Sequence, residues 1–489
     1  MKILLINPPD TTEEVLGKAH VFVSELDPLG LLYIAAVVEE NGYDVEVLDA
    51  YINQLSISEI LKEIADRKPD IIGITVLTAN GAATYQICKA IRENHGEMKI
   101  VLGNHHASAF SKVYLEHNCA DAVIHGEADY VFLEIVQRYE KGTNDLAEIQ
   151  GVSWWDGDKV IDNTPGNIPV LVEDVSSLPM PARHLVDSSR YSIGSLNNFI
   201  YVNRGDKEVR QMFTSRGCVY KCSFCAVRKL FRYNTPMRVV DEIEHLIDNY
   251  NVGYIFIMDS LFISNKKRVI EICKEIIKRK IDIKWGCESH VKILNEELVY
   301  WMEKAGCYEM HFGIESGVQR ILKSIEKRTT LDIIRNTIEM VKRKSNIKVA
   351  GLFMIGLPGE TVEDVETTIE FAKSLPIDFA QFSTTVPYPG SPLFDQLVAQ
   401  GKVDTGVRED GSLDIEVWKR YSAHTGFSDN EPIYVPDTMT AEQVKALEKK
   451  ALRSFYLRPH IFIQQLRRFN LKQNPFMMAK AFKSVFMEG

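Results

Sequence analysis

No stretch of 18 consecutive apolar residues occurs in this chain of 489 residues, so the sequence predicts no membrane-spanning helix. The apolar run from Met1 to Asn7 is cut short by Pro8 and Pro9, which excludes a signal peptide at this position. An excess of positive charge is also absent, because 57 Lys and Arg against 67 Asp and Glu leave a net charge of -10. This balance argues against a protein that binds nucleic acid.

Cysteine is too scarce for a disulfide framework, since only eight occur in the whole chain. Five of them are scattered singly among apolar residues, which predicts that they pack in cores: Cys88, Cys119, Cys273, Cys287 and Cys307. Few cysteines without a disulfide framework are typical of a protein in a reducing cytoplasm. No internal repeat or low-complexity tract is present either.

The remaining three cysteines form a compact motif. Cys218, Cys222 and Cys225 have the spacing Cys-x3-Cys-x2-Cys, and no fourth Cys or His follows within several residues. Structural zinc sites and the cubanes of electron carriers use four ligands. Three thiolates on a short loop therefore indicate a four-iron cluster with one iron open to another ligand. A buried or zinc-binding cysteine group is the alternative.

The first 140 residues alternate short β-branched runs with helical patterns. Strands are predicted at 3–7, 45–49, 70–75, 99–103 and 122–126, and helices near 30–41, 56–67, 82–94 and 108–117. This alternation predicts an α/β domain with a doubly wound parallel sheet of flavodoxin or Rossmann type. Such a sheet binds ligands beyond the carboxyl ends of its strands.

A second strand-helix alternation begins after a proline-containing stretch with a predicted hairpin. Six strands are expected near 211–215, 254–258, 283–287, 308–314, 348–355 and 380–386, which predicts a partial (β/α)6 barrel of TIM type. Catalytic residues of barrels gather at the carboxyl ends of the strands, and the cysteine motif follows the first strand there. The expected domains are 1–142, a linker 143–205, the barrel 206–398 and a helical region 399–489.

The cysteine motif and the polar strand ends between 210 and 395 resemble the radical S-adenosylmethionine (SAM) superfamily. The resemblance implies a [4Fe-4S] cluster on Cys218, Cys222 and Cys225, reductive cleavage of SAM to a 5'-deoxyadenosyl radical, and an external electron donor of flavodoxin or ferredoxin type. It also implies SAM contacts at Phe224, Asp259, Glu315, Ser316, Met354 and Gly356. From the residues alone, Asp259 equally suits a helix cap, and Glu315, Ser316 and Gly356 suit strand-to-helix turns. Relatives often carry an arginine where this chain has Glu288-Ser289-His290.

The amino-terminal sheet resembles the cobalamin-binding subfamily, through runs such as Leu102-Gly103-Asn104-His105-His106. The cobalamin contacts implied by the resemblance are Pro9, Leu29, Gly30, Thr75, Val76, Leu77, Thr78, Gly103, Asn104, His105, Gly126 and Glu127. The Asp-x-His-x-x-Gly motif that often binds cobalt is missing, which predicts that no histidine binds the lower face. A sheet that has lost its ligand is the alternative. His105 and His106 suit contacts to the cofactor's tail or to an interface, and each also suits a loop histidine.

The carboxyl-terminal tail lacks acidic residues. From Lys449 to Met487 there is no Asp or Glu but there are nine Lys and Arg, interleaved with apolar residues. Such a tail either packs onto the acidic remainder of the protein or lies on an anionic membrane surface. Because some relatives act on isoprenoid, hopanoid or tetrapyrrole molecules, a small lipid-like or tetrapyrrole substrate is a hypothesis.

The function that the resemblance implies is a cobalamin-dependent radical SAM methyltransferase, which uses the 5'-deoxyadenosyl radical and methylcobalamin at an unactivated carbon. A cobalamin-dependent radical cyclase or rearrangement enzyme shares the same two domains and is the alternative. Methylthiolation would require a second cysteine triad, and the amino-terminal domain has only Cys88 and Cys119. A cobalamin or redox sensor would not need a row of SAM-like contacts. No acid or base catalyst is predicted.

Overall fold

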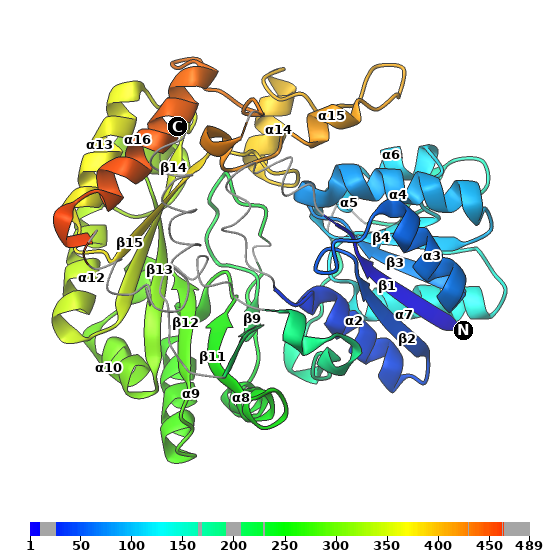
Figure 1. The fold of residues 1–489 in the computed structure, drawn as a ribbon, viewed down its shortest axis with the longest axis horizontal. Helices are drawn as coiled ribbons and strands as arrows, with labels where there is room; N and C mark the ends of the chain where they lie inside the picture. The colour runs from blue at the N-terminus through cyan, green and yellow to red at the C-terminus, as the bar shows by residue number, and fades with distance from the viewer. Residues whose placement is uncertain are drawn as a thin grey trace. The chain divides into compact units, whose positions relative to one another are not determined.

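The computed structural model describes residues 1–9, 26–164, 169–191, 207–227, 230–428, 430–461 and 463. The chain divides into two compact units (Figure 1). The first consists of Met1–Thr12, Asp27–Tyr191 and Tyr388–Tyr421, and the second of Glu13–Leu26, Ser192–Pro387 and Ser422–Gly489. The first unit therefore combines the amino-terminal sheet with Tyr388–Tyr421, a segment that follows the barrel strands in the sequence.

The first unit is built on one seven-stranded sheet in the order β2-β1-β3-β4-β5-β6-β7. Its strands are β1 (Lys2–Asn7), β2 (Asp44–Asp49), β3 (Ile71–Thr75), β4 (Lys99–Gly103), β5 (Ala122–Ile124), β6 (Val152–Trp155) and β7 (Val160–Asp162). The first five pair in parallel, as the sequence predicts. The predicted hairpin is also present as β6 and β7, and it extends the sheet by pairing antiparallel to β5.

Helices cover this sheet where the apolar pattern places them: α2 (Leu29–Glu40), α3 (Ile57–Arg67), α4 (Gly81–Asn94), α5 (His105–Ala109), α6 (Ser111–Glu116) and α7 (Ala128–Glu140). Ser56 and Glu59 form a capping box that begins α3. Gly73 in β3 lets α7 approach the sheet, because a Cβ there would lie 2.7 Å from Leu5 and 2.9 Å from Phe132. The helix expected at 108–117 is divided into α5 and α6, and α7 was not expected.

The second unit contains a six-stranded parallel sheet in the sequential order β15-β14-β13-β12-β11-β8. Its strands are β8 (Glu208–Met212), β11 (Val252–Ile257), β12 (Lys284–Ser289), β13 (Cys307–Glu315), β14 (Lys348–Ile355) and β15 (Phe379–Thr384). All six predicted barrel strands are confirmed, with β8 a few residues earlier than expected. Since β8 and β15 are the two edges, the sheet is a half barrel rather than a closed one.

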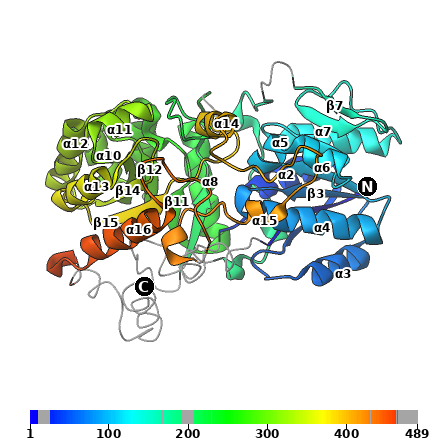
Figure 2. The ribbon, with the colours of Figure 1, turned by 90° about the horizontal axis from the view of Figure 1, so that it is seen from above.

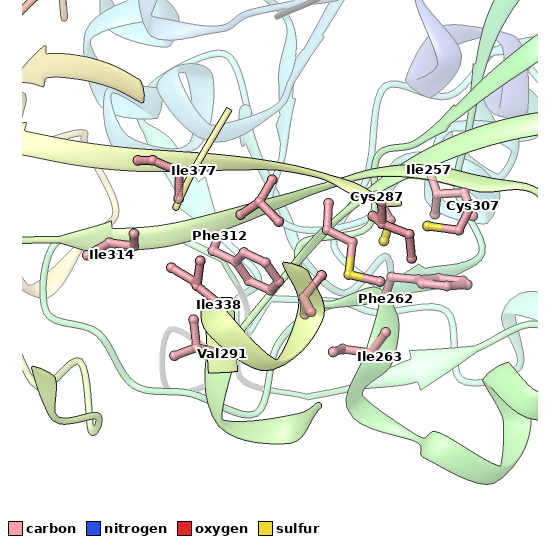
Figure 3. Close-up of a cluster of buried hydrophobic side chains, with 14 of the residues drawn as sticks. Ile257, Phe262, Ile263, Cys287, Val291, Cys307, Phe312, Ile314, Ile338 and Ile377 are labelled. Carbon is pink, nitrogen blue, oxygen red and sulfur yellow. The ribbon is translucent and has the colours of Figure 1, made fainter. Parts of the chain in front are cut away.

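Helices lie on the outer side of this curved sheet (Figure 2). They are α8 (Pro236–Tyr250), α9 (Lys266–Lys278), α10 (Glu296–Lys304), α11 (Gln319–Ser324), α12 (Leu331–Lys344), α13 (Val362–Ser374) and α16 (Ala441–Tyr456). The apolar core between helices and strands contains Cys287 and Cys307, whose sulfur atoms lie among Ile257 and Phe262 (Figure 3). All five scattered cysteines are buried, which confirms their packing role.

The basic carboxyl-terminal region packs on the second unit as far as the structure describes it. Phe455 of α16 is fully buried in the core, and Lys450 forms an ion pair with Glu366. The Arg458 guanidinium donates a hydrogen bond of 2.7 Å to the Lys373 carbonyl. The rest of the acid-free tail, residue 462 and residues 464–489, lies outside the described residues. Every helix in the described ranges is too short or too polar to cross a bilayer.

Candidate active site

The three-cysteine loop starts at the carboxyl end of the first barrel strand. After β8 the chain forms the short strand β9 (Ser215–Arg216), which pairs antiparallel with β10 (Arg232–Tyr233). Cys218 follows β9 by two residues, so this small ladder closes the loop at its base. The position agrees with the sequence prediction that the motif lies at the mouth of the barrel.

Backbone hydrogen bonds hold the loop in place. The Cys225 N–H donates to the Cys222 carbonyl (3.2 Å), and the Ser223 N–H donates to the Ile325 carbonyl after α11 (3.1 Å). Cys222 is buried, while Cys218 and Cys225 are half-buried. The loop therefore presents its thiols from a fixed backbone.

These thiols fit a cubane. Within the described parts of the chain, no three His, Cys, Asp or Glu side chains converge on the position of a single metal ion. A cubane makes a different demand, because each cysteine binds its own iron. Three thiols on one ordered loop meet that demand, and the fourth iron is then open to an exogenous ligand.

Asp259, at the end of β11, fastens the base of this loop. Its buried carboxylate accepts hydrogen bonds from the Thr214 N–H (2.6 Å), the Thr214 hydroxyl (2.5 Å) and the Ser215 hydroxyl (2.6 Å). Burial raises the pKa of Asp259, although the nearby Arg268 and these hydrogen bonds oppose the shift. Arg268 donates to the carbonyls of Thr214 (2.6 Å) and Asn234 (2.8 Å). Asp259 and Arg268 thus fix both strands that carry the loop, while a contact of Asp259 to SAM stays a prediction.

A buried ion pair lies beside the cysteines. The Lys327 ammonium is 2.7 Å from Oε1 of Glu315, which ends β13 with a φ of +68°. Burial opposes the charged form of Lys327, but the charges of Glu315 and Cys222 outweigh it and raise the pKa of the lysine. The ammonium also lies 6.0 Å from the centre of the Phe224 ring. Sequence reasoning missed Lys327, because a lysine in a charged turn looks like a surface residue.

An apolar cluster forms where the resemblance implies the SAM contacts. Phe224 and Met354 pack against the buried side chains of Ile321, Ile325 and Leu357. Two predicted residues from distant parts of the chain are thereby brought together beside the cysteine loop. The Ser316 hydroxyl is instead fully buried and lies 3.2 Å from the Thr368 hydroxyl.

The turn after β14 is held by a carboxyl group. Oε2 of Glu360 accepts hydrogen bonds from the N–H groups of Gly356 (2.8 Å) and Leu357 (3.1 Å), and Gly356 has a φ of +82°. That φ favours glycine at this position. Burial raises the pKa of Glu360 to about 8.

The shift of Glu360 predicts a pH-dependent stability. Its folded-state pKa of about 8 exceeds the ordinary value of 4.5, so between these values the folded state binds more protons than the unfolded state. We expect the free energy of unfolding to fall as pH rises through this window, by about 1.4 kcal/mol per pH unit at most. Urea unfolding of the apoprotein at pH 5.5 and 7.5 measures this slope. Glu360→Gln should reduce it, whereas Glu363→Gln, an exposed neighbour, should not; equal slopes in both variants would contradict the assignment.

The end of the third barrel strand also contacts the cysteine loop. The Tyr220 ring stacks on His290 with a centroid distance of 4.0 Å and an interplanar angle of 16°. The His290 Nε2 lies 3.3 Å from the Lys327 carbonyl oxygen, and burial lowers the pKa of His290 to about 4. The segment that departs from its relatives therefore provides an aromatic support for the loop.

Polar residues also line the interior of the half barrel. Oε2 of Glu309 lies 3.3 Å from Nε2 of His311, and Tyr254 donates a hydrogen bond to the same carboxylate. Burial opposes protonation of His311, but Glu309 outweighs it and raises the pKa of the histidine. The alternation of Glu309, His311 and Gly313 along β13 is a signal that could have identified this inward face from sequence.

In the first unit, the strand ends offer room for a ligand. A Cβ added at Gly30 or Gly103 would meet no atom within 4 Å. The Asn104 amide donates to the Thr75 hydroxyl (3.1 Å), which joins the ends of β3 and β4, and Leu77 is 46% exposed. Gly103 ends β4, and its carbonyl accepts a hydrogen bond of 2.9 Å from the N–H of Val76, the neighbour of Leu77; open backbone at this strand end would let a large flat cofactor approach closely.

Other predicted cobalamin contacts have partners within the protein. A Cβ at Gly126 would lie 2.1 Å from the Val170 carbonyl oxygen, and Oε2 of Glu127 accepts a hydrogen bond from the Val172 N–H (2.7 Å). Three further predicted contacts are buried: Leu29, Val76 and Thr78, the last in the turn that begins α4. Pro9 is half-buried and His105 is exposed. These assignments stay predictions. His20 lies outside the described residues.

The structure places His106 within α5 and in the core of the first unit, so it is neither a loop histidine nor a contact to the cofactor's tail. Its ring is fully buried and lies 4.3 Å from Trp418 and 4.7 Å from Phe110, centroid to centroid, so it is a core residue rather than a contact to a cofactor. Neither ring nitrogen has a hydrogen-bond partner, and burial lowers the pKa of His106 to about 3.

This buried imidazole predicts acid sensitivity of the first unit. The unfolded state, with an ordinary pKa of 6.5, binds more protons than the folded state between pH 6.5 and about 3, so stability is expected to decrease as pH falls through that window. His106→Leu should weaken this decrease, by up to about 1.4 kcal/mol per pH unit. The adjacent, exposed His105→Leu is the matched control. Urea unfolding at pH 7.5 and 5.0 measures the effect, and an unchanged pH dependence of His106→Leu would refute it.

Comparison with known proteins agrees with a separate candidate site in each unit. The B12 binding domain family matches residues 18–136, and the radical SAM superfamily matches residues 212–372. An uncharacterized methyltransferase of Pyrococcus horikoshii is 33% identical over 473 residues, which cover 95% of each chain. The anaerobic magnesium-protoporphyrin IX monomethyl ester cyclase of Rubrivivax gelatinosus is 29% identical over 81% of this chain and 70% of its own.

Among solved structures, the radical SAM methyltransferase TsrM of Kitasatospora setae, with tryptophan and a SAM analog bound, has the same fold. Its TM-score is 0.66 at 18% identity, over 94% of this chain and 89% of its own. Fold and site together define a radical SAM enzyme with an amino-terminal cobalamin-binding domain. The chain belongs to this family of enzymes, whose cofactors are a [4Fe-4S] cluster, SAM and cobalamin.

Proposed function

We propose that this protein is a methyltransferase that transfers a methyl group to an unactivated carbon of a small molecule. The observation that carries the proposal is the presence, in one chain, of an open three-thiol loop at the strand ends of a half barrel and a B12-binding domain. The similarity over nearly the whole chain to a protein named a methyltransferase supports it.

The protein's own residues would divide the work as follows. Cys218, Cys222 and Cys225 would hold the cluster, which supplies an electron to SAM. Phe224, Met354 and Gly356 would enclose one face of SAM, and Lys327 would offset the negative charge of the thiolates. The space over Gly30 and Gly103 would receive cobalamin, which carries the methyl group.

The reaction balances with two electrons. One C–H bond of the substrate, two SAM and two electrons give one C–CH3 bond, 5'-deoxyadenosine, methionine and S-adenosylhomocysteine. The reductant must come from outside the chain, so we also propose an external one-electron donor. We propose a lipid-like or tetrapyrrole molecule as the substrate.

Anaerobic reconstitution with iron, sulfide, SAM, cobalamin and reductant, followed by mass spectrometry, tests the proposal. Equimolar 5'-deoxyadenosine and S-adenosylhomocysteine, with a product heavier by one methylene, are expected. Formation of 5'-deoxyadenosine without S-adenosylhomocysteine would instead favour the second candidate, a radical cyclase or rearrangement enzyme. The similarity to the Rubrivivax gelatinosus cyclase supports that candidate.

We further propose that the part of the tail beyond α16 lies on an anionic membrane surface. The sequence from 464 to 487 contains five Lys and Arg and no Asp or Glu. Flotation with anionic liposomes, for the full chain and for a chain ending at Ile463, tests this; equal flotation would exclude it.

A further inference from the structure

The chain segment around the cysteine loop has an unusual charge. From Val209 to Val240 it contains no Asp or Glu and seven Lys or Arg, in a protein whose net charge is -10. Part of this charge is structural, because Arg210 and Arg232 are buried. Lys221, within the loop itself, is exposed.

Exposed apolar side chains accompany this charge. Val219 in the loop is 52% exposed, Leu230 54%, Tyr233 43% and Met237 49%. Arg216 and Arg232 pair with each other in the β9–β10 ladder. Cys218 lies two residues after Arg216 and Leu230 two residues before Arg232, so both leave the ladder at the same end. Leu230 therefore leaves the ladder beside the cysteine loop, while Tyr233, paired with Ser215, lies at the other end of the ladder.

Two lysines at the start of α9 extend the surface. The Asn265 amide, which caps α9, donates to the Tyr233 hydroxyl (3.2 Å), and Arg268 lies 5.3 Å from the centre of the Tyr233 ring. Lys266 and Lys267 follow the cap and are exposed. Helices α8 and α9 pack against each other, but Met237 of α8 lies beside Arg279 at the end of α9 (Nη2 to Sδ, 3.7 Å) and not beside Lys266 and Lys267.

We propose that this surface docks a small acidic electron-carrier protein that reduces the cluster. The surface consists of Lys221, Leu230, Tyr233, Lys266 and Lys267. The inference rests on the proposed function, which requires an external donor, and adds where that donor binds. An apolar centre with a basic rim suits an acidic partner, since a protein of net negative charge would repel such a partner elsewhere.

The electron transfer is simple in its balance. The carrier would lose one electron per encounter: one electron would cleave SAM through the cluster, and the second would return cobalamin to the form that accepts a methyl group, so one methyl transfer would take two encounters. A carrier seated beside the loop that holds the thiols has a short path to the iron. On the acidic parts of the protein surface, the same carrier would be repelled by charge and would lie farther from the cysteine loop.

Charge reversal at the rim tests the proposal without touching the cysteine loop. Lys266→Glu/Lys267→Glu places acids in the first turn of α9, where the helix dipole tolerates them. Lys274→Glu/Lys280→Glu makes the same change of net charge farther along α9 and just beyond its end, and serves as the matched control. The probe is an acidic flavodoxin in its reduced form, with reduced methyl viologen as a small donor that needs no docking surface.

Two measurements decide the outcome. Titration of the holoenzyme with flavodoxin at low salt should give an affinity roughly tenfold weaker for the first variant than for the wild type and the control, and the difference should shrink with added salt. Carbodiimide cross-links should map to Lys266 or Lys267. The rate of 5'-deoxyadenosine formation should fall with flavodoxin but not with viologen.

Equal flavodoxin affinity of both variants, or cross-links confined to the carboxyl-terminal tail, would overturn the docking surface. Failure of the wild type to form 5'-deoxyadenosine with viologen would overturn the proposed function instead. Binding and cross-linking would still decide the docking surface in that case.

Discussion

Replacing Cys222 with alanine is expected to remove the cluster and reduce formation of 5'-deoxyadenosine by roughly a hundredfold or more. Loss of an outer-shell partner of a metal ligand already costs 10–100-fold, and here a ligand itself is lost. Two remaining thiols would leave a second iron without a protein ligand. Iron and sulfide content per chain, together with the yield of 5'-deoxyadenosine, measure the effect.

Cys273→Ala is the matched control, because Cys273 is equally a buried free cysteine but packs in the core from α9. This variant should bind a full complement of iron and lose only about 1 kcal/mol of stability. Wild-type iron content in Cys222→Ala would show that the loop does not hold the cluster. Equal loss of iron in both variants would point to misfolding rather than to ligation.

Replacing Lys327 with methionine is expected to lower the free energy of unfolding of the apoprotein by about 3–5 kcal/mol. The reason is that Glu315 would keep a buried charge without its partner, since both side chains are at least nine-tenths buried. Urea unfolding at pH 7 measures the loss. Retention of iron by the holoenzyme should also decrease, because the ammonium offsets the charge of the thiolates.

The double variant Glu315→Gln/Lys327→Met should recover much of this stability, since no buried charge is then left unpaired. An exposed pair provides the comparison: Lys344 and Glu296 lie 2.9 Å apart at about half exposure, and Lys344→Met should cost less than about 1 kcal/mol. A loss below 1 kcal/mol for Lys327→Met would mean that Glu315 takes up a proton or finds another partner.

Local sequence patterns predicted much of the fold. The β-branched runs and helical periods predicted the five parallel strands of the first unit and the six of the half barrel, because each pattern lies within a few neighbouring residues. Boundaries were less accurate at α5 and α6, where the chain bends at Phe110 within one apolar pattern. Helix α7 was missed, although its apolar spacing follows the same rule.

What the sequence by itself determined was the cysteine spacing and the order of strand ends, since both are properties of the linear chain. Only the tertiary structure decided how those ends are supported: Asp259 fastens the base of the loop, Lys327 pairs with Glu315, and Trp418 buries His106. Each of these contacts joins residues that no local pattern relates. Burial raises the pKa of Asp259 and lowers that of His106, whereas the charge of Glu315 outweighs burial and raises the pKa of Lys327.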